Sequence, residues 1–158
     1  ANYLRYKGIN QIDALVLSHS GRDHIGGFEK IIKEFNVVEL WDNGYLKYFP
    51  PLKDKIIHRK LKAGDVLYKE NMKFLILHPM KGYYSLKGDE KNNFSLVLKV
   101  YFGKVSVLFT GDIEKDAEEN LLKIRNVLKT KILKIPHHGS KTSTTQRFLL
   151  SVKPDIAI

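Results

Sequence analysis

The chain of 158 residues contains no cysteine, and its apolar runs are short. The lack of cysteine excludes disulfide bonds and thiolate metal sites, and it leaves the cellular compartment undecided. No apolar run approaches the roughly 20 residues that a membrane-spanning helix needs, and no signal-peptide pattern opens the chain. These residues therefore predict no membrane segment within the chain.

Acidic residues are also scarce. The chain has 17 aspartates and glutamates against 27 lysines and arginines, which gives a formal net charge of +10. This excess favours an anionic partner such as DNA or a phosphorylated polymer. An alternative stays open, because lysines scattered along the sequence also arise from base composition or heat adaptation without any polyanionic ligand. The 43% hydrophobic fraction allows one folded core, and we treat residues 1–158 as one domain or part of one.

Strand-like and helix-like patterns alternate along the chain, which predicts an α/β layered sandwich. Strands are expected at 14–18, 37–41, 66–68, 73–77, 95–102, 105–110, 131–135 and 155–158, and helices at 25–35, 114–127 and 144–152. The strands 95–102 and 105–110 should pair as a hairpin across Gly103 and Lys104. We expect Ser143 to cap the last helix, Pro50 and Pro51 to break any helix, and residues 80–93 to form a surface loop.

One loop carries three side chains that can ligate a metal. The segment 18–27 follows an apolar run and precedes an amphipathic segment, and it contains His19, Asp23 and His24. Imidazole nitrogen and carboxylate oxygen are ligands of divalent metals such as zinc. Asp23 is also placed to cap the helix that follows. Alone, the loop also fits a capped turn with two surface histidines.

Two later segments repeat the pattern at the ends of apolar strands. Asp112 follows Gly111 after one strand, and His137 and His138 follow another. Gly-Asp alone is weak evidence, because it is a common turn. The histidine pair is stronger evidence, although such a pair seen alone is more often solvated surface. Together, three strand ends with metal-ligand residues predict a metal site at one edge of a sheet. The two adjacent histidines should point in different directions, so that one can bind metal while the other faces a substrate.

These segments resemble the motifs of the metallo-β-lactamase-fold hydrolases, whose first motif reads His-x-His-x-Asp-His. With residues 8–13, 92–98, 108–114 and 133–141, they are similar to the C-terminal domain of bacterial competence DNA-uptake proteins of the ComEC/Rec2 type. The resemblance implies an αββα sandwich, of which this chain would be an internal segment without the opening and closing strands. The full-length family protein is a membrane channel, which implies the outer face of the cytoplasmic membrane; otherwise the domain would be soluble.

The resemblance also implies a metal site, with Asp112 shared between two ions. The implied ligands are His19, Asp23, His24, Asp112 and His138. Gly21 stands where the broader fold has a second histidine, and no histidine precedes the strand at 95–102. We therefore expect one firmly held ion and a second, weaker one that has only His19 and Asp112. Zinc or manganese is expected, and an oxygen-rich weaker position favours Mn²⁺ or Mg²⁺. No organic cofactor is implied.

The implied activity is that of a metal-dependent phosphodiesterase, a nuclease that degrades DNA during uptake. Asp23 would be a ligand and a proton acceptor, and His137 would hold a phosphate oxygen or protonate the leaving oxygen. Ser140 and Lys141 would bind the phosphate. Two alternatives stay open: a hydrolase of a non-nucleic phosphodiester, and a DNA-binding module with a degenerate metal site. β-Lactam hydrolysis fits the motif variant less well.

The two remaining histidines are assigned by their neighbours. His58 lies among lysines and an arginine and is expected to be exposed. His78 ends a strand before Pro79, which would allow it to approach the edge of the site.

Overall fold

The computed structural model describes residues 1–46, 55–83 and 90–158, so the expected break at Pro50 and Pro51 and part of the expected loop 80–93 lie outside the described residues. The helices and strands, with two 3₁₀ helices η1 and η2, are in chain order α1 Asn2–Tyr6, β1 Gln11–Val16, α2 Arg22–Ile25, α3 Phe28–Glu34, β2 Asn36–Asp42, β3 Ile57–Lys60, β4 Val66–Lys69, β5 Met72–His78, α4 Glu90–Asn93, β6 Val97–Phe102, β7 Val105–Phe109, α5 Lys115–Leu121, η1 Leu122–Val127, β8 Ile132–Leu133, η2 Pro136–Gly139, α6 Gln146–Val152 and β9 Ile156–Ala157.

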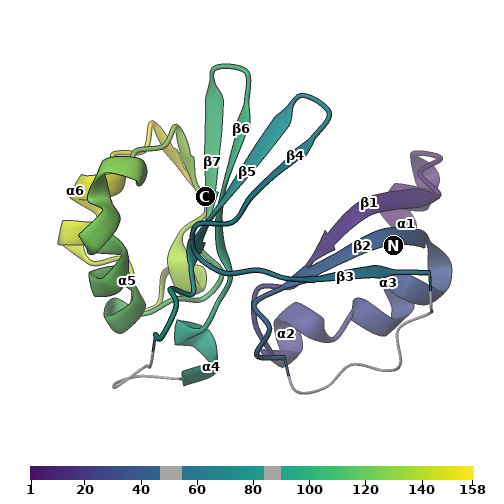
Figure 1. Ribbon diagram of the computed structural model, residues 1–158, viewed down its shortest axis with the longest axis horizontal. Coiled ribbons are helices and arrows are strands. Elements are labelled where there is room, and N and C mark those ends of the chain that lie inside the picture. Colours follow the sequence, from purple (N-terminus) through teal and green to yellow (C-terminus); the bar gives the residue numbers. More distant parts are fainter. Residues whose placement is uncertain (47–54, 84–89) are drawn as a thin grey trace.

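The strands form two sheets that face each other (Figure 1). The smaller sheet has the order β1-β2-β3 and is parallel throughout. The larger sheet has the order β4-β5-β6-β7-β8-β9, antiparallel from β4 to β7 and parallel from β7 to β9. Helices α2 and α3 lie outside the smaller sheet, and α5 and α6 lie outside the larger one (Figure 1). The αββα arrangement predicted from the sequence is confirmed.

Three hydrophobic clusters fill the spaces between these four layers. Between the sheets, Trp41 of β2 is fully buried and packs edge-on against Phe74 of β5, with ring centroids 5.1 Å apart. Phe28 and Ile32 of α3 pack on the smaller sheet. The third cluster, between the larger sheet and its helices, includes Phe148 of α6, which is completely buried. Burial of this apolar surface is the main favourable term in folding and fixes the layers that position the loops.

Two expected helices differ from the sequence prediction. The helix expected at 25–35 is two short helices, because the chain turns at Gly26 and Gly27. Gly21 is the N-cap residue of α2, and Asp23 lies inside its first turn, so the predicted capping role of Asp23 is wrong. The helix begins earlier than the apolar periodicity suggests, and the Asp23 carboxylate is left to face His24.

At the other end of the chain, Thr145 caps α6 by accepting a hydrogen bond from the Phe148 N–H, so the predicted Ser143 cap is also wrong. The Ser143 hydroxyl instead donates to the Pro136 carbonyl.

Further differences concern lengths. The helix expected at 114–127 is α5 followed by a 3₁₀ helix, with non-helical backbone at Ile124. Strands β8 and β9 are shorter than expected, and β3 and α4 were not anticipated. The hairpin of β6 and β7 is confirmed.

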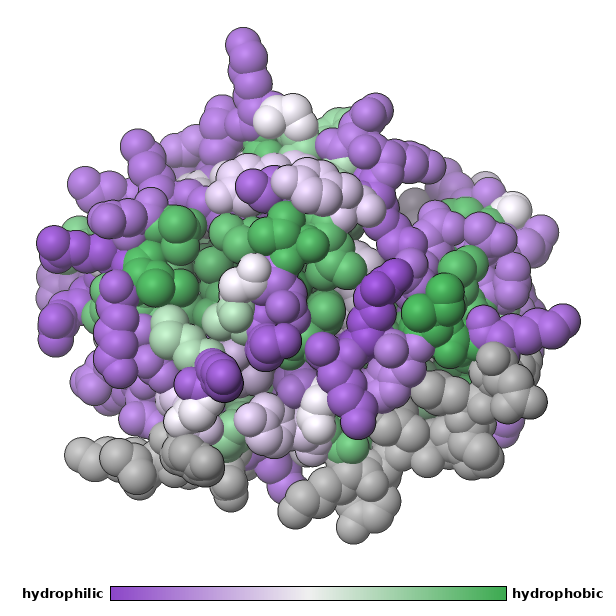
Figure 2. Space-filling model, viewed as in Figure 1, coloured by the Kyte–Doolittle hydropathy of each residue, from purple (hydrophilic) through white to green (hydrophobic). Residues whose placement is uncertain are grey.

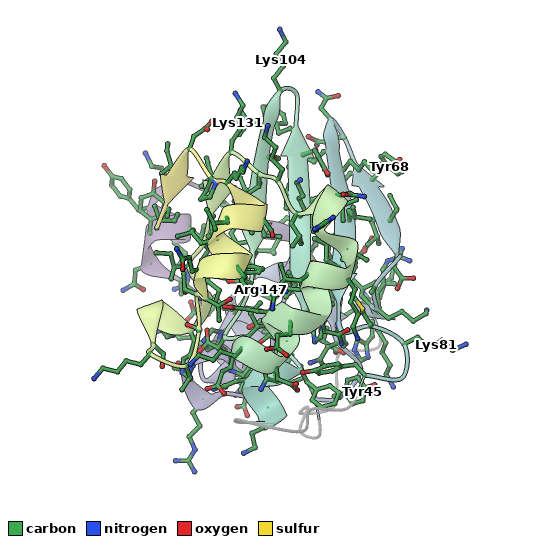
Figure 3. All side chains as sticks on the ribbon, turned by 90° about the vertical axis from the view of Figure 1, so that its left-hand side faces the viewer. Tyr45, Tyr68, Lys81, Lys104, Lys131 and Arg147 are labelled. Carbon is green, nitrogen blue, oxygen red and sulfur yellow. The ribbon has the colours of Figure 1, made fainter. Side chains whose placement is uncertain are left out.

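The positive charge is spread over the surface. Figure 3 shows Lys104 at the tip of the β6–β7 hairpin and Lys81 and Lys131 projecting outward elsewhere. Figure 2 shows apolar surface between hydrophilic side chains on one face of the molecule. Among the described residues, no helix has the length and apolar character required to cross a membrane.

Candidate metal centre

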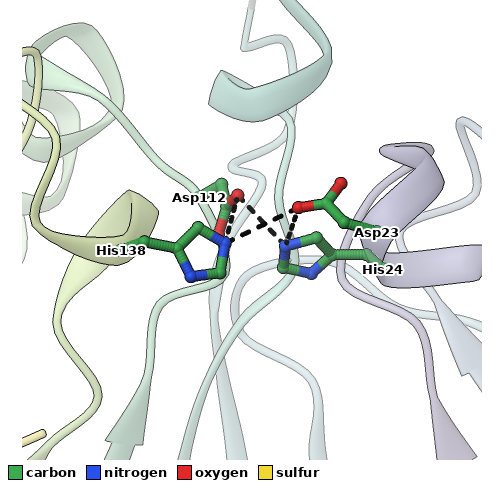
Figure 4. Close-up of side chains that lie close together, drawn as sticks. All are labelled: Asp23, His24, Asp112 and His138. Atoms are coloured by element: carbon green, nitrogen blue, oxygen red, sulfur yellow. Dashed lines mark hydrogen bonds and ion pairs between the residues drawn. The ribbon is translucent and has the colours of Figure 1, made fainter.

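Four side chains from three segments that follow strands lie close together (Figure 4). Asp23 and His24 lie in α2, the first helix after β1, and Asp112 follows β7. His138 lies in η2, the first helix after β8. Each residue offers one ligand atom, and these four atoms all lie within 4.8 Å of one another. The convergence of loops from different strand ends, which the motif spacing predicted, is present.

The contacts within this group, here called the four-residue cluster, run between imidazole nitrogens and carboxylate oxygens. Asp112 Oδ2 lies 3.0 Å from His24 Nε2 and 3.4 Å from His138 Nε2. Asp23 Oδ2 lies 3.5 Å from His24 Nε2 and 3.6 Å from His138 Nε2. A proton on each Nε2 atom could form hydrogen bonds for some of these four nitrogen–oxygen contacts. One divalent cation, in contrast, could bind all four atoms at once.

Ser18 orients the histidine rings. Its hydroxyl oxygen lies 3.0 Å from His24 Nδ1 and 3.1 Å from His19 Nδ1. When both Nδ1 atoms carry protons and donate to this oxygen, both Nε2 atoms present lone pairs. A hydrogen bond to the far nitrogen is the usual way in which proteins fix a metal-binding imidazole. The donor set and its orientation therefore fit a divalent cation.

Asp112 is the buried member of the cluster, with 3% of its surface exposed. Its backbone N–H donates to Ser95 Oγ at 3.0 Å. Gly111 permits this approach, because its φ of 56° is left-handed and a Cβ there would lie 2.7 Å from Ser95 Cβ. Burial by itself would raise the pKa of Asp112, but the nearby charges of His24, Lys134, His19 and His138 hold it below its usual value.

His19, predicted as a ligand, lies beside the cluster and outside it. It is 1% exposed, and its Nε2 is 4.0 Å from Asp112 Oδ2. A Cβ at Gly21 would lie 2.6 Å from His19 Nε2 and 2.9 Å from Asp23 Oδ1. A side chain at position 21, where the broader fold has a ligand, would therefore require His19 to move. The structure brings together the four residues that were expected to hold the first metal ion. Of the two residues expected at the weaker metal position, His19 lies outside this group, near Asp112.

The substrate-binding residues expected after β8 lie around the cluster. His137 and His138 both have left-handed backbone, with φ of 46° and 51°, which is uncommon outside glycine and typical of functional sites. His137 Nδ1 lies 3.3 Å from Glu114 Oε1 and takes no part in the cluster. Ser140 Oγ lies 3.0 Å from Thr142 Oγ1, and the Lys141 side chain is exposed. Their roles stay predictions.

The other two histidines lie away from the cluster. His58 is half-buried and hydrogen-bonded to the fully buried Asp42, so the expectation that it is solvated is wrong. His78 is completely buried, and its Nε2 donates to the Asn93 carbonyl at 2.8 Å. Burial lowers the pKa of His78 to about 4. It packs against Tyr83 inside the core and not at the edge of the site.

Sequence reasoning assigned no role to Lys134, which approaches the site from the end of β8. Its Nζ donates to the Gly111 carbonyl at 2.9 Å and lies 3.4 Å from Asp112 Oδ1. The register of the parallel pair β7–β8 matches Leu108 with Leu133. That pairing, had it been known, would have placed Lys134 beside the strand that leads to Asp112.

Comparison with known proteins identifies the family to which this arrangement corresponds. Residues 2–158 match the model of the metallo-beta-lactamase superfamily. The chain is 35% identical over 166 residues to ComE operon protein 3 of Bacillus subtilis, covering 99% of this chain and 21% of that protein. It is 32% identical over 156 residues to competence protein ComA of Neisseria gonorrhoeae, covering 98% of this chain and 21% of the relative. The chain thus spans about a fifth of the length of these relatives.

Solved structures share the fold at much lower identity. CmlA, a diiron beta-hydroxylase from Streptomyces venezuelae, superimposes with a TM-score of 0.63 at 14% identity, over 94% of this chain and 35% of that one. A diphosphatase from the PhnP family superimposes with a TM-score of 0.53 at 18% identity, over 99% of this chain and 65% of that one. A hydroxylase and a diphosphatase share this fold, so the activity has to be argued from the site.

Proposed function

Because the chain belongs to the metallo-beta-lactamase superfamily and is similar to ComEC-family competence proteins, we propose that it is a metal-dependent phosphodiesterase that cleaves DNA. The chain is a hydrolase of this superfamily that is related to competence proteins. We propose that its substrate is the phosphodiester backbone of DNA and that it acts during DNA uptake. In that setting the domain acts at the outer face of the cytoplasmic membrane, on incoming DNA.

The observation that carries the proposal is the four-residue cluster. Asp23, His24, Asp112 and His138 supply two carboxylate oxygens and two imidazole nitrogens within 4.8 Å of one another. When bound there, a divalent ion such as Zn²⁺ or Mn²⁺ would activate water and neutralise charge on a phosphate. Ser18 and Ser95 hold His24 and Asp112 in place by hydrogen bonds.

The residues around the cluster suit an anionic substrate. Arg22, which precedes Asp23 in α2, and Lys141, three residues after His138, are both exposed. His137 Nδ1 lies 3.3 Å from Glu114 Oε1, and the proposal gives His137 the role of protonating the leaving oxygen. The Asp23 carboxylate is exposed and can take a proton from water. The net charge of +10 adds a general attraction for DNA.

The test is cleavage of end-labelled single-stranded and duplex DNA in Mn²⁺, Zn²⁺ or Mg²⁺. The variants Asp112→Ala and His138→Ala remove cluster ligands and should abolish cleavage. His58→Gln is the matched control, because it alters a histidine–aspartate pair outside the cluster and should retain activity. Cleavage that survives both ligand changes would contradict the proposal.

Two further outcomes separate the alternatives. Turnover of bis(p-nitrophenyl) phosphate without cleavage of DNA would point to a non-nucleic phosphodiester as substrate. Salt-sensitive DNA binding without metal or turnover would point to a binding module, since release of counterions makes the affinity for DNA depend steeply on salt.

A further inference from the structure

Lys134 brings a permanent positive charge to the buried carboxylate of the metal centre. Its Nζ donates to the Gly111 carbonyl at 2.9 Å and lies 3.4 Å from Asp112 Oδ1. The side chain is 27% exposed, so the ammonium lies at the border between the buried carboxylate and solvent. Its backbone is fixed as well, because the Lys134 carbonyl accepts a hydrogen bond from Thr110 Oγ1 at 2.8 Å.

The two oxygens of Asp112 therefore face different partners. Oδ2 faces the imidazoles, with His24 Nε2 at 3.0 Å and His138 Nε2 at 3.4 Å, whereas Oδ1 faces Lys134. The two ions of a two-metal site lie about 3.5–4 Å apart, and a carboxylate that they share can give one oxygen to each. Here an ammonium group lies against the second oxygen.

The remainder of a second metal position is sparse. His19 lies 4.0 Å from Asp112 Oδ2, the same oxygen that faces the cluster. A side chain at position 21 would require His19 to move, because a Cβ there would lie 2.6 Å from His19 Nε2. Among the described residues, the group that could hold a metal ion consists of Asp23, His24, Asp112 and His138.

We propose that Lys134 is the second cation of this centre: its ammonium pairs with Asp112 Oδ1, and the site takes one divalent ion on Oδ2. Lys134 is then a positioning residue that also supplies positive charge where the fold otherwise recruits a second ion. This inference rests on the proposed metal site. It adds that the site binds one ion, and that Lys134 limits the number to one by occupying Asp112 Oδ1.

The proposal predicts the direction in which metal affinity changes when the charge is removed. A fixed positive charge next to a ligand repels a divalent ion and competes for the carboxylate. Lys134→Met should therefore bind the ion more tightly, by roughly tenfold. If Lys134 only held the Asp112 side chain in place, the same variant would bind the ion more weakly.

The test is isothermal titration of the metal-free protein with Mn²⁺ and with Zn²⁺, and metal content at saturation by mass spectrometry. The variants are Lys134→Met and Lys134→Arg, which keeps the charge. Lys69→Met is the matched control: its ammonium is also partly exposed and lies 2.7 Å from a buried carboxylate, Glu39 Oε1, outside the cluster. Lys134→Gln, whose amide can still donate to the Gly111 carbonyl, replaces Lys134→Met if that variant does not fold by circular dichroism.

The wild type should bind one ion, Lys134→Met should bind it more tightly, and Lys134→Arg and Lys69→Met should stay within about threefold of the wild type. One ion in the wild type with equal or weaker binding in Lys134→Met would overturn this inference and leave the proposed function standing. Two ions in the wild type would also overturn it. No bound ion in the wild type would overturn both.

Discussion

Two buried carboxylates, Glu39 and Asp112, are neutralised in opposite ways. Glu39 lies between the sheets and is 7% exposed. Its Oε2 accepts hydrogen bonds from Arg59 Nε at 2.8 Å and Trp41 Nε1 at 2.6 Å, and its Oε1 accepts one from Lys69 Nζ at 2.7 Å. Burial alone would raise the pKa of Glu39, but these hydrogen bonds and charges lower it to about 2.

Asp112 is buried more deeply, yet among the described residues it has one permanent cation nearby. Lys134 Nζ lies at 3.4 Å, and the other neighbours are imidazoles, whose charge depends on protonation. Removing a carboxylate from water is costly unless it is fully paired. The described residues thus pair both oxygens of Glu39 with permanent cations, whereas Asp112 has a lysine at Oδ1 and imidazoles at Oδ2. Glu39 is therefore a carboxylate that joins two sheets, whereas Asp112 belongs to a cluster whose donor atoms fit a divalent cation.

The largest expected effect comes from neutralising Asp112. Asp112→Asn should lower the affinity for Mn²⁺ or Zn²⁺ by more than about 100-fold, because it removes the central ligand charge. The unfolding free energy of the metal-free protein should change by less than about 1 kcal/mol, since the substitution removes one ion pair with a permanent cation, Lys134. Titration calorimetry and urea denaturation measure the two quantities. A large loss of metal-free stability would show that Asp112 is a structural carboxylate like Glu39.

The reverse pattern is expected at Glu39. Glu39→Gln should destabilise the protein by roughly 2–3 kcal/mol, because it removes the charge that Arg59 and Lys69 share. Its metal affinity should equal that of the wild type. Urea denaturation and calorimetry check the pair of results. A metal affinity that falls together with stability would mean that the two carboxylates are not independent.

A buried base gives a third contrast, which pH reveals. The pKa of His78 is about 4 in the folded protein and 6.5 when unperturbed, so between these values the unfolded chain binds a proton that the folded chain does not. Stability from this group is complete above pH 6.5 and is lost as the pH falls toward 4, with a slope of up to about 1.4 kcal/mol per pH unit.

Urea denaturation of the wild type and His78→Gln between pH 7.5 and 4.5 isolates this contribution, because the two proteins differ only at this side chain. The variant should show the shallower dependence on pH. Equal slopes would count against a buried neutral His78. The loss from Glu39 follows only at lower pH, between 4.5 and about 2.

The smallest effect is expected at His19. His19→Asn should change metal affinity by less than about tenfold, because His19 Nε2 lies outside the four-residue cluster, at 4.0 Å from Asp112 Oδ2. His24→Asn, measured alongside, should cost far more. An equal loss of metal affinity in the two variants would show that His19 is a metal ligand and would support a site with two ions.

The motifs allowed the fold and all four residues of the cluster to be predicted, because ligand residues at three strand ends have to meet at one edge of the layered sheets. The Asp23 and Ser143 caps were wrong, because Gly21 and Thr145 begin those helices instead. Contacts from distant segments decide such boundaries. Ser95 and Lys134 contact the site through packing between strands that are distant in the sequence, and Ser18 does so through the fold of its loop. The local sequence pattern does not predict these contacts.

The most direct measurement is the anomalous difference density of crystals grown with Mn²⁺. We predict one peak, from one Mn²⁺ ion that lies about 2.0–2.3 Å from the Oδ2 atoms of Asp23 and Asp112 and the Nε2 atoms of His24 and His138. Lys134 Nζ should remain beside Asp112 Oδ1. A second peak of similar height bonded to His19 and Asp112, or no peak among the four residues, would contradict the account.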